Sequence, residues 1–343
     1  MANNFDSNFT RKLARVFLEK FDSERVLSKN VNTQLLAGKF DPSTGSNYDF
    51  KRPNDYVSVR TATGDVTAET ASSIITGKAT GTVQDYFTAF VDYDEADEAI
   101  KMDQLDQLLK PMATRLKTDL ELDFAAFMMK NTAGKVGTTG TGVTTWDQVA
   151  EAGAYLQATG VPMDNAWCYG VNPFTQRKLA SDQRSLGGET GAMTANQRAT
   201  ITDNFAGMKV MTATTLANYT TGVGADRAGT VVGTPVATYL TAKDTMTQVV
   251  GVTAFQANLV IAAGETVTVT GVNRLNLSTR QPMIDENGAP IVFTGTVTET
   301  VTLDGSGAGN LTITGPAIYE ATGAYNSVNI GIAASDVITL GGA

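Results

Sequence analysis

Histidine is absent from all 343 residues, and cysteine occurs once, as Cys168. The lack of histidine excludes the Ser-His-Asp and Cys-His catalytic arrangements, and it removes the commonest zinc ligand. A single cysteine forms no internal disulfide, which fits a reducing cytoplasm. Its apolar neighbours Trp167 and Tyr169 predict a buried, inert thiol. We therefore expect no enzymatic activity, no metal site and no cofactor.

Long hydrophobic runs and a secretory leader are missing as well. No segment approaches the ~18 apolar residues that a membrane span needs. The start, MANNFDSNFT, lacks the basic and apolar regions of a signal peptide. Apolar residues make up 42% of the chain and charged residues 18%, which is typical of a globular protein. We expect a protein that stays in soluble form and has no membrane partner.

Positive charge is scarce, since 26 Lys and Arg stand against 35 Asp and Glu, for a formal net charge of −9. Such a chain is a poor general binder of nucleic acid, because phosphate binding needs an excess of cations on one face. The charge is also uneven: residues 222–343 contain only 13 charged side chains. This change in composition marks a candidate domain boundary near residue 222.

Seven acids crowd into residues 92–106, just before an expected helix. A calcium-binding loop would need a glycine at its sixth position and a spaced terminal glutamate, and both are missing. Paired catalytic carboxylates are an alternative, but no suitable donor surrounds them. We interpret the acids mainly as favourable charges at the start of the helix. Gly77-Lys78 resembles the end of a phosphate-binding loop, but Ser72 and Ala79 depart from that motif.

Hydrophobic spacing predicts mainly helical structure in the first part of the chain, with a polar loop between two helices. Residues 1–40 form an amphipathic arm that packs either on its own domain or on a neighbouring molecule. Residues 61–82 show no apolar periodicity, which is typical of a long two-stranded loop that needs contacts with another element for stability. Short β-type stretches are expected on either side of it, at 56–60 and 87–93. A helix of 25–30 residues follows, with a kink or break expected at Pro111, and it ends near Asn131.

The second half alternates helices and strands and then becomes rich in Thr, Val and Gly. A helix over 145–159, capped by Thr145 and closed at Gly160, precedes strands at 166–171 and 208–212. A short helix over 173–181 and a Gly-rich loop over 186–195 lie between those strands. From residue 222 onward, period-2 alternation with glycine-bearing turns predicts an antiparallel barrel or sandwich.

Several segments resemble the coat proteins of short-tailed lambdoid double-stranded DNA bacteriophages. In chain order they are LSKNVNTQLLAGKFDPSTG (27–45), FKRPNDYVSVRTATGD (50–65), ITGKATGTV (75–83), DEAIKMDQLDQLLKP (97–111), DFAAFMMKN (123–131), GAPIVFTGTVT (288–298) and PAIYEATGAYNSV (316–328). The resemblance extends over nearly the whole chain, and FKRP with the downstream RTATGD is its most specific part.

The resemblance implies an α+β fold, the major capsid fold of the Hong Kong 97 type, with an inserted antiparallel β-barrel domain. The expected parts are an N-terminal arm (1–45), an E-loop (46–90), a peripheral domain with the spine helix (91–135), an axial/peripheral α+β domain (136–221) and the inserted barrel (222–343). In the family, strands that follow the barrel close the axial and peripheral domains, and this sequence ends about where they would begin.

The function that the resemblance implies is that of a major capsid protein, which assembles into hexamers and pentamers of an icosahedral phage head. Implied partners are other copies of the chain, a scaffolding protein, a portal protein and packaged double-stranded DNA held without tight binding. The implied location is the virion, assembled in the host cytoplasm.

Two sets of contact residues follow from these expectations. The poorly self-buried loop places basic residues where they could meet the acidic stretch of the next subunit. The resemblance points to a loop of the barrel that reaches a neighbouring capsomer, and a simple exposed hairpin tip is the alternative at Lys243 and Asp244. The expected subunit contacts are Arg52, Arg60, Lys78, Asp94, Asp97, Lys243 and Asp244. The expected contacts with a basic scaffolding segment are Asp6, Glu19, Asp22 and Glu24, although the same acids would also suit a solvated face.

Three other functions fit the sequence less well. An encapsulin-like compartment shell would share the fold, but the β module and the FKRP segment resemble phage coats. A β-rich surface adhesin would explain the Thr/Val region, but the chain has one β module and no signal peptide. An enzyme fits least, because the sequence holds neither histidine nor a catalytic motif.

Overall fold

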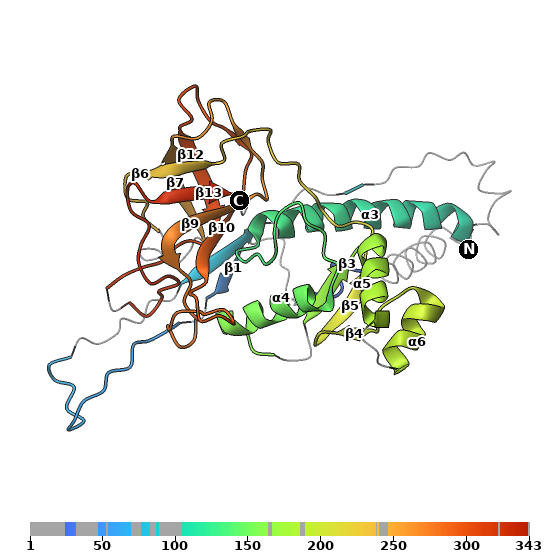
Figure 1. Ribbon diagram of the computed structural model, residues 1–343, viewed down its shortest axis with the longest axis horizontal. Helices are drawn as coiled ribbons and strands as arrows, with labels where there is room; N and C mark the ends of the chain where they lie inside the picture. Colours follow the sequence, from blue (N-terminus) through green and yellow to red (C-terminus); the bar gives the residue numbers. More distant parts are fainter. Residues whose placement is uncertain are drawn as a thin grey trace, which may run out of the picture.

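The computed structural model describes residues 25–31, 47–52, 54–69, 77–82, 87–88, 105–163, 167–185, 189–237, 239, 246–321 and 323–341. These residues form an α+β subunit. A long helix, α3, runs between a region of helices and a small sheet at one end and a β-barrel at the other (Figure 1). Helix α4 runs below α3 in that view, and the barrel lies against the ends of both helices.

Helix α3 (Leu105–Asn131) has 27 residues, or about 40 Å at ~1.5 Å per residue. It continues through Pro111, so no break occurs there. Proline lacks a backbone N–H, so one intrahelical hydrogen bond is absent within the first two turns of α3. The apolar stripe is only partly covered, because Ala125 is buried whereas Phe127 is 61% exposed. The subunit therefore leaves part of this helix open to other molecules.

Helix α4 (Trp146–Thr159) begins and ends as the sequence predicts. Thr145 is the N-cap, and its hydroxyl and the Gln148 side chain each bind the other residue's backbone N–H in a capping box. Gly160 closes the helix at φ +102°, a left-handed conformation that glycine adopts without a steric penalty.

Helices α5 (Pro173–Ser185) and α6 (Glu189–Arg198) pack beside a three-stranded sheet in the order β3-β5-β4. The shared core includes Val149, Leu179 and Met208, which are all at least 97% buried. The strands are β3 (Cys168–Val171), β4 (Asn204–Phe205) and β5 (Met208–Thr212), with β3 and β5 parallel.

Two sequence expectations in this region are wrong. Residues 186–195 were expected to form a Gly-rich loop, but α6 occupies most of that range. Buried Ala195 ties α6 to the core, so tertiary packing outweighs the low helix propensity of Gly191. Cys168, expected to be buried, is partly exposed on β3. Its strand lies at the edge of the small sheet, where burial is incomplete.

The C-terminal region is a closed antiparallel barrel with strand order β10-β12-β7-β6-β13-β9. Alternating side chains fill its interior, and Val267, Phe293, Leu311 and Ile338 are completely buried. A two-stranded sheet, β11-β8, adds to it. The strands are β6 (Ala228–Val232), β7 (Thr247–Thr253), β8 (Val260–Ile261), β9 (Thr266–Asn273), β10 (Val292–Val297), β11 (Val301–Thr302), β12 (Gly309–Thr314) and β13 (Val337–Leu340).

Strands β1 (Asn47–Lys51) and β2 (Lys78–Thr82) form an antiparallel pair. We call residues 52–77, which connect them, the hairpin loop; in Figure 1 its described residues 54–69 extend away from the body at the lower left. The paired strands are not the predicted ones, because residues 56–60 belong to no strand of the structure. Alternation alone does not reveal whether a partner strand is in register. Of the stretch predicted at 87–93, only 87 and 88 are described, and neither is in a strand.

Candidate functional site

Arg280 joins the base of the hairpin loop to the barrel. Its Nη2 contacts the Asp55 carboxylate, and its Nη1 donates to the Asn326 carbonyl oxygen at 2.8 Å. The backbone N–H of Asp55 donates to the Tyr325 hydroxyl oxygen at 3.2 Å. The start of the loop is therefore held by one charged and one neutral contact from the barrel.

Two tyrosines and a second arginine complete this junction. The rings of Tyr239 and Tyr325 meet edge to face with their centroids 5.8 Å apart. The Arg52 guanidinium lies 5.6 Å from the Tyr239 ring centroid, within cation–π range, and its Nε donates to the Lys78 carbonyl oxygen at 3.3 Å. Burial raises the pKa of Tyr239 even though the positive charge of Arg52 favours the phenolate.

A tight turn at Asn276 sets the position of Arg280. The Asn276 Oδ1 accepts hydrogen bonds of 2.8 Å from the backbone N–H groups of Ser278 and Thr279. Its Nδ2 donates to the Ala158 carbonyl oxygen, at the end of α4, at 2.7 Å. Arg280 itself has φ +57°, a conformation uncommon for residues other than glycine. The junction thus includes the end of α4 as a third element.

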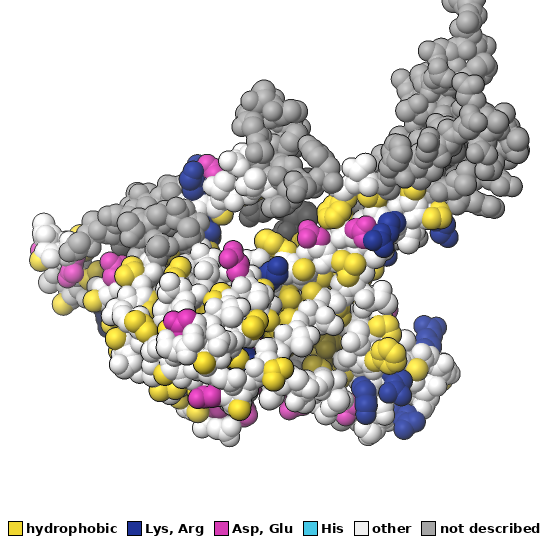
Figure 2. All heavy atoms as spheres, turned by 90° about the horizontal axis from the view of Figure 1, so that it is seen from above, with side chains coloured by type: hydrophobic (Ala, Val, Ile, Leu, Met, Phe, Trp, Pro, Cys, Tyr) yellow, Lys and Arg dark blue, Asp and Glu magenta, His cyan; other side chains and the backbone are white. Residues whose placement is uncertain are grey.

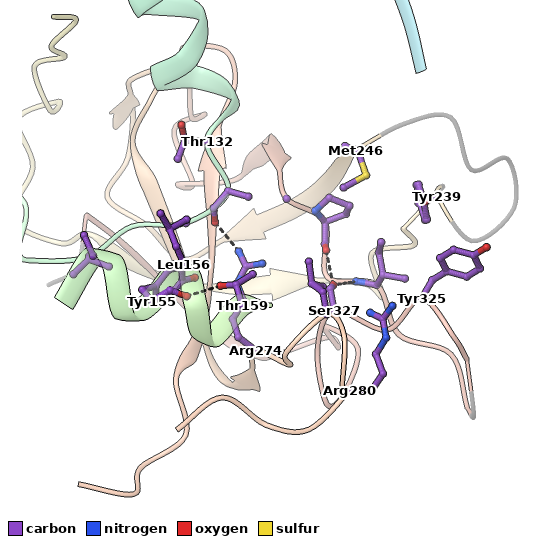
Figure 3. A pocket seen from close by; sticks show the side chains of 18 of the residues that line it. Thr132, Tyr155, Leu156, Thr159, Tyr239, Met246, Arg274, Arg280, Tyr325 and Ser327 are labelled. Atoms are coloured by element: carbon purple, nitrogen blue, oxygen red, sulfur yellow. Dashed lines mark hydrogen bonds between the residues drawn. The ribbon is translucent and has the colours of Figure 1, made fainter. Parts of the chain in front are cut away.

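A pocket of about 890 Å³ lies between the hairpin-loop base, α4 and the barrel. Figure 3 shows side chains of α4 and of the barrel region around it, with Tyr155 on one side and Tyr325 on the other. Asp55 is the one carboxylate among the described residues that line it, and Arg280 already neutralises that charge. The described walls offer no paired carboxylates for acid–base chemistry, so we interpret the pocket as a structural junction.

Buried Arg274 fastens the barrel to the end of α3. Its Nη2 donates to the Ala133 carbonyl oxygen at 2.6 Å and contacts the Thr294 carbonyl oxygen, and its guanidinium lies 4.9 Å from the Phe293 ring centroid (Figure 3). Burial lowers the pKa of Arg274 because the charged form loses hydration. Next to it, the Thr296 hydroxyl donates to the Thr132 carbonyl oxygen at 2.5 Å.

Glu121, in the middle of α3, holds the described N-terminal residues 25–31. Its side chain is completely buried. One carboxylate oxygen accepts the Leu27 N–H at 2.7 Å, and the other accepts the Ser28 N–H at 3.1 Å and the Ser28 hydroxyl at 2.6 Å. Burial acts to raise the pKa of Glu121, but these hydrogen bonds together outweigh it and lower the pKa.

The hairpin loop itself has little packing within the subunit. Tyr56, Val57, Val59 and Val66 are 52%, 45%, 47% and 63% exposed. Several large apolar side chains exposed along one projecting segment are typical of a surface that another molecule covers. A subunit whose polar contacts fasten its parts together, and whose projecting loop exposes apolar groups, is suited to association with other subunits.

The described residues contain three of the expected subunit contacts, all in or beside the hairpin loop. Arg52 lies in the junction, and Lys78 pairs with Asp49 of its own hairpin at 3.0 Å. Arg60 is exposed in the hairpin loop. Arg52 and Lys78 lie side by side, because the Arg52 Nε donates to the Lys78 carbonyl oxygen at 3.3 Å. The other expected contacts, Asp94, Asp97, Lys243, Asp244, Asp6, Glu19, Asp22 and Glu24, lie outside the described residues.

Sequence reasoning missed the residues that fasten the subunit together, namely Asp55, Glu121, Arg274 and Arg280. Asp55 and Arg280 are separated by 225 positions, and Leu27 and Glu121 by 94. A single sequence offers no signal for such pairs. Glu121 gave no signal either, because the apolar stripe of α3 continues through Leu116, Leu120 and Phe124 without a gap.

Comparison with known proteins identifies the class as phage capsid proteins. The family model described as "P22 coat protein - gene protein 5" matches residues 1–342, so the chain belongs to the P22 coat protein family. The major capsid protein of Acyrthosiphon pisum secondary endosymbiont phage 1 is 33% identical over 344 residues, covering 99% of this chain and 81% of that protein.

Solved structures give weaker likenesses. A chain of Mycobacterium phage Che8 has a TM-score of 0.40 at 13% identity, over 84% of this chain and 90% of that one. The capsid structure of the cyanophage P-SCSP1u has a TM-score of 0.36 at 12% identity, over 83% of this chain and 89% of that one.

Membership in this family makes the chain a capsid-forming structural protein of a phage virion. Coat proteins are not a class of enzyme. None of the helices that the structure describes is long and apolar enough to cross a membrane.

Proposed function

We propose that this chain is the major capsid subunit that forms the hexamers and pentamers of an icosahedral phage head, enclosing double-stranded DNA and assembling in the host cytoplasm. The observation that carries the proposal is the hairpin loop, which is held at its base by Arg280 but exposes Tyr56, Val59 and Val66. Covering these side chains with a neighbouring copy would bury apolar surface that one subunit leaves in water.

In the proposed arrangement the fold is of the Hong Kong 97 type. The hairpin loop with β1 and β2 belongs to the E-loop (46–90), α3 is the spine helix of the peripheral domain (91–135), and α4 to α6 with the small sheet belong to the axial/peripheral domain (136–221). The closed barrel (222–343) is a domain inserted in that fold, and residues 1–45 are the N-terminal arm. Partly exposed Phe127 on α3 supports the idea that the spine helix also meets a neighbour.

The proposed charged contacts are those between the basic residues at the hairpin loop and the acids of the next subunit. Exposed Arg60 is the best placed of these, and Asp94 and Asp97 are its proposed partners. Exposed ion pairs contribute only about 0–1 kcal/mol each, but a shell repeats each pair many times. Lys243 and Asp244 are proposed as contacts with a neighbouring capsomer.

A scaffolding protein and a portal protein are the proposed partners during assembly. A basic scaffolding segment would bind the acidic N-terminal arm, with Asp6, Glu19, Asp22 and Glu24 as the contact residues. Charges at the solvent-exposed edge of an interface set the association rate and its salt dependence more than the affinity. Binding of the scaffold that does not change with salt would contradict these contacts.

Electron microscopy of negatively stained particles tests the proposal, using the full chain expressed with and without a candidate scaffolding protein. Closed, uniform shells are expected with the scaffold. The triple variant Tyr56→Ser/Val59→Ser/Val66→Ser should fold normally, because exposed positions change stability by about 0.5 kcal/mol or less, yet yield few shells. Ile284→Ser, at a barrel residue that is 62% exposed, is the control. Normal shell yield from the triple variant would contradict the role of the loop.

A further inference from the structure

Four cationic side chains gather on α5 and α6, in a chain whose net charge is −9. In Figure 2, Lys and Arg side chains concentrate on the lobe at the lower right, the end of the molecule where these helices lie in Figure 1. All four side chains are exposed. We call this group the α5–α6 patch; it consists of Arg177, Lys178, Arg184 and Arg198.

No ion pair within the described part of the subunit uses these charges. Asp182, four residues after Lys178, accepts a hydrogen bond of 2.7 Å from the Trp146 backbone N–H, and it is not within ion-pair distance of Lys178. Arg184 and Arg198 stand in the last turns of their helices, where a cation stabilises the helix dipole. Arg177 is in neither a first nor a last turn, so that effect does not explain it.

The patch is held on a rigid support. Leu179, which faces away from Arg177 and Arg184 on α5, is completely buried in the core, and Ala180 beside the patch is 97% buried. The N-terminus of α5 is fixed by the Asn172 side chain, which accepts the Thr175 N–H at 2.7 Å. Arg177 and Arg184 are seven residues apart, so they lie on one stripe about 10 Å long, at ~1.5 Å per residue. That length corresponds to roughly three base pairs of duplex DNA at ~3.4 Å each.

We propose that the α5–α6 patch contacts the phosphate backbone of duplex DNA inside the head. This inference rests on the proposed function and deepens it by naming the surface that meets the genome. Arginine suits phosphate because its guanidinium presents a planar set of donors, and three of the four cations are arginines. Only four phosphates would be neutralised, so binding by one subunit is weak and becomes effective when many subunits surround confined DNA.

The number of cations fixes the expected salt dependence. Release of four counterions gives a slope of about −3.6 for the logarithm of the binding constant against the logarithm of salt concentration, since each contact contributes about −0.9. Raising salt sixfold, from about 25 to about 150 mM, therefore weakens binding roughly 600-fold. Isolated subunits should bind at micromolar concentration at the lower salt and show no measurable binding below about 100 μM at the higher.

Fluorescence anisotropy with a labelled 30-base-pair duplex, titrated with the purified full chain, tests this inference. Arg177→Glu/Lys178→Glu should weaken binding at low salt at least tenfold, whereas Arg177→Lys/Lys178→Arg should keep both affinity and slope. Arg115→Glu/Lys117→Glu on α3 is the control with an equal change of net charge, and it should bind as the wild type does. Shell yield of the Arg177→Glu/Lys178→Glu variant should be unchanged.

Several results would overturn the inference. They are no duplex binding at low salt, equal binding by the Arg177→Glu/Lys178→Glu variant, or an equal loss in the α3 control. A synthetic peptide of residues 89–108 that displaces the duplex would show that the patch binds the acidic stretch of another copy instead. Failure of the proposed function would appear separately, as absence of shells from the wild-type chain with its scaffold, whatever the duplex titration shows.

Discussion

The Arg280 guanidinium contacts the Asp55 carboxylate across 225 positions of sequence, and in doing so it fixes the direction in which the hairpin loop leaves the subunit. The Asp55 side chain is 44% exposed and the Arg280 side chain 25%, so solvent screens the charge interaction. The contact therefore adds little to the free energy of folding, and its main effect is to position a loop that has little other packing.

Asp55→Ala should lower the free energy of unfolding by only about 0.5–1 kcal/mol, yet it should loosen the loop. Spin labels at Gly64→Cys and Ile284→Cys, in a Cys168→Ser background, would report the loop-to-barrel distance by pulsed electron resonance. The distance distribution should broaden in the variant. Asp65→Ala is the control, because its carboxylate bonds to Thr67 within the loop. Equal widths in all three proteins would show that Arg280 does not position the loop.

Glu121→Gln should lower the free energy of unfolding by about 1–3 kcal/mol, because a buried charged acceptor loses part of its hydrogen bonding to Leu27 and Ser28. Urea unfolding of the purified subunit at neutral pH measures the change. Asp123→Asn, on the exposed face of the same helix, should change stability by less than about 0.5 kcal/mol. Matching losses in the two variants would argue against a specific role for Glu121.

The wild-type subunit should also lose this contribution in acid. The folded pKa of Glu121 lies below its ordinary value of 4.5, so folding favours the charged form. The stabilisation is therefore fully present above the ordinary pKa and disappears as pH falls through the lowered folded pKa. The stability difference between wild type and Glu121→Gln should narrow over that acidic range; a difference that stays constant would contradict the assignment.

The barrel should fold without the rest of the chain. Its six strands close on themselves, and its core residues come from within residues 222–343. The excised segment is expected to show one cooperative thermal transition, with charge reversal at Lys243 and Asp244 impairing shells while leaving that transition intact. A disordered fragment would refute the domain, and normal shells from the double reversal would refute the contact.

Arg60→Glu/Lys78→Glu should reduce shell yield, because it reverses two of the three basic charges at the hairpin that are proposed to meet acids of the next subunit. Lys78 also pairs with Asp49, so part of the loss could arise within the hairpin. Asp49→Asn, which removes the same internal pair without reversing a basic charge, separates the two effects. Unchanged particle counts for the double variant would rule out the proposed charged contact.

Local signals in the sequence predicted those parts of the fold that depend on neighbouring residues. Thr145 and Gly160 mark the ends of α4, and the Thr/Val alternation from residue 266 becomes β9. The strand partners of the hairpin and the existence of α6 were not predictable in this way, because register and core packing decide them.

The contacts that orient the parts of the subunit were even harder to predict from the sequence. Asp55 resembles any turn aspartate in a polar loop, and Arg274 follows a β-strand pattern without a sign that its guanidinium reaches Ala133. The contact residues expected from charge patterns include Lys78, which is already paired within its own hairpin. Charge density in a sequence indicates where an ion pair is possible, but not which partner is nearest.

Closure of the barrel determines the order in which parts of this subunit fold during synthesis. The first barrel strand, β6, pairs with the last, β13, so the barrel cannot close while the ribosome still holds β13. The carbonyl groups of Thr132 and Ala133, just after α3, accept their hydrogen bonds only after Thr296 and Arg274 have been synthesised. Pairing between distant segments is slow, and the open strands are exposed to aggregation meanwhile. Residues 337–340 must therefore be synthesised before the surface around the end of α3 is complete, and association that needs this surface follows that step.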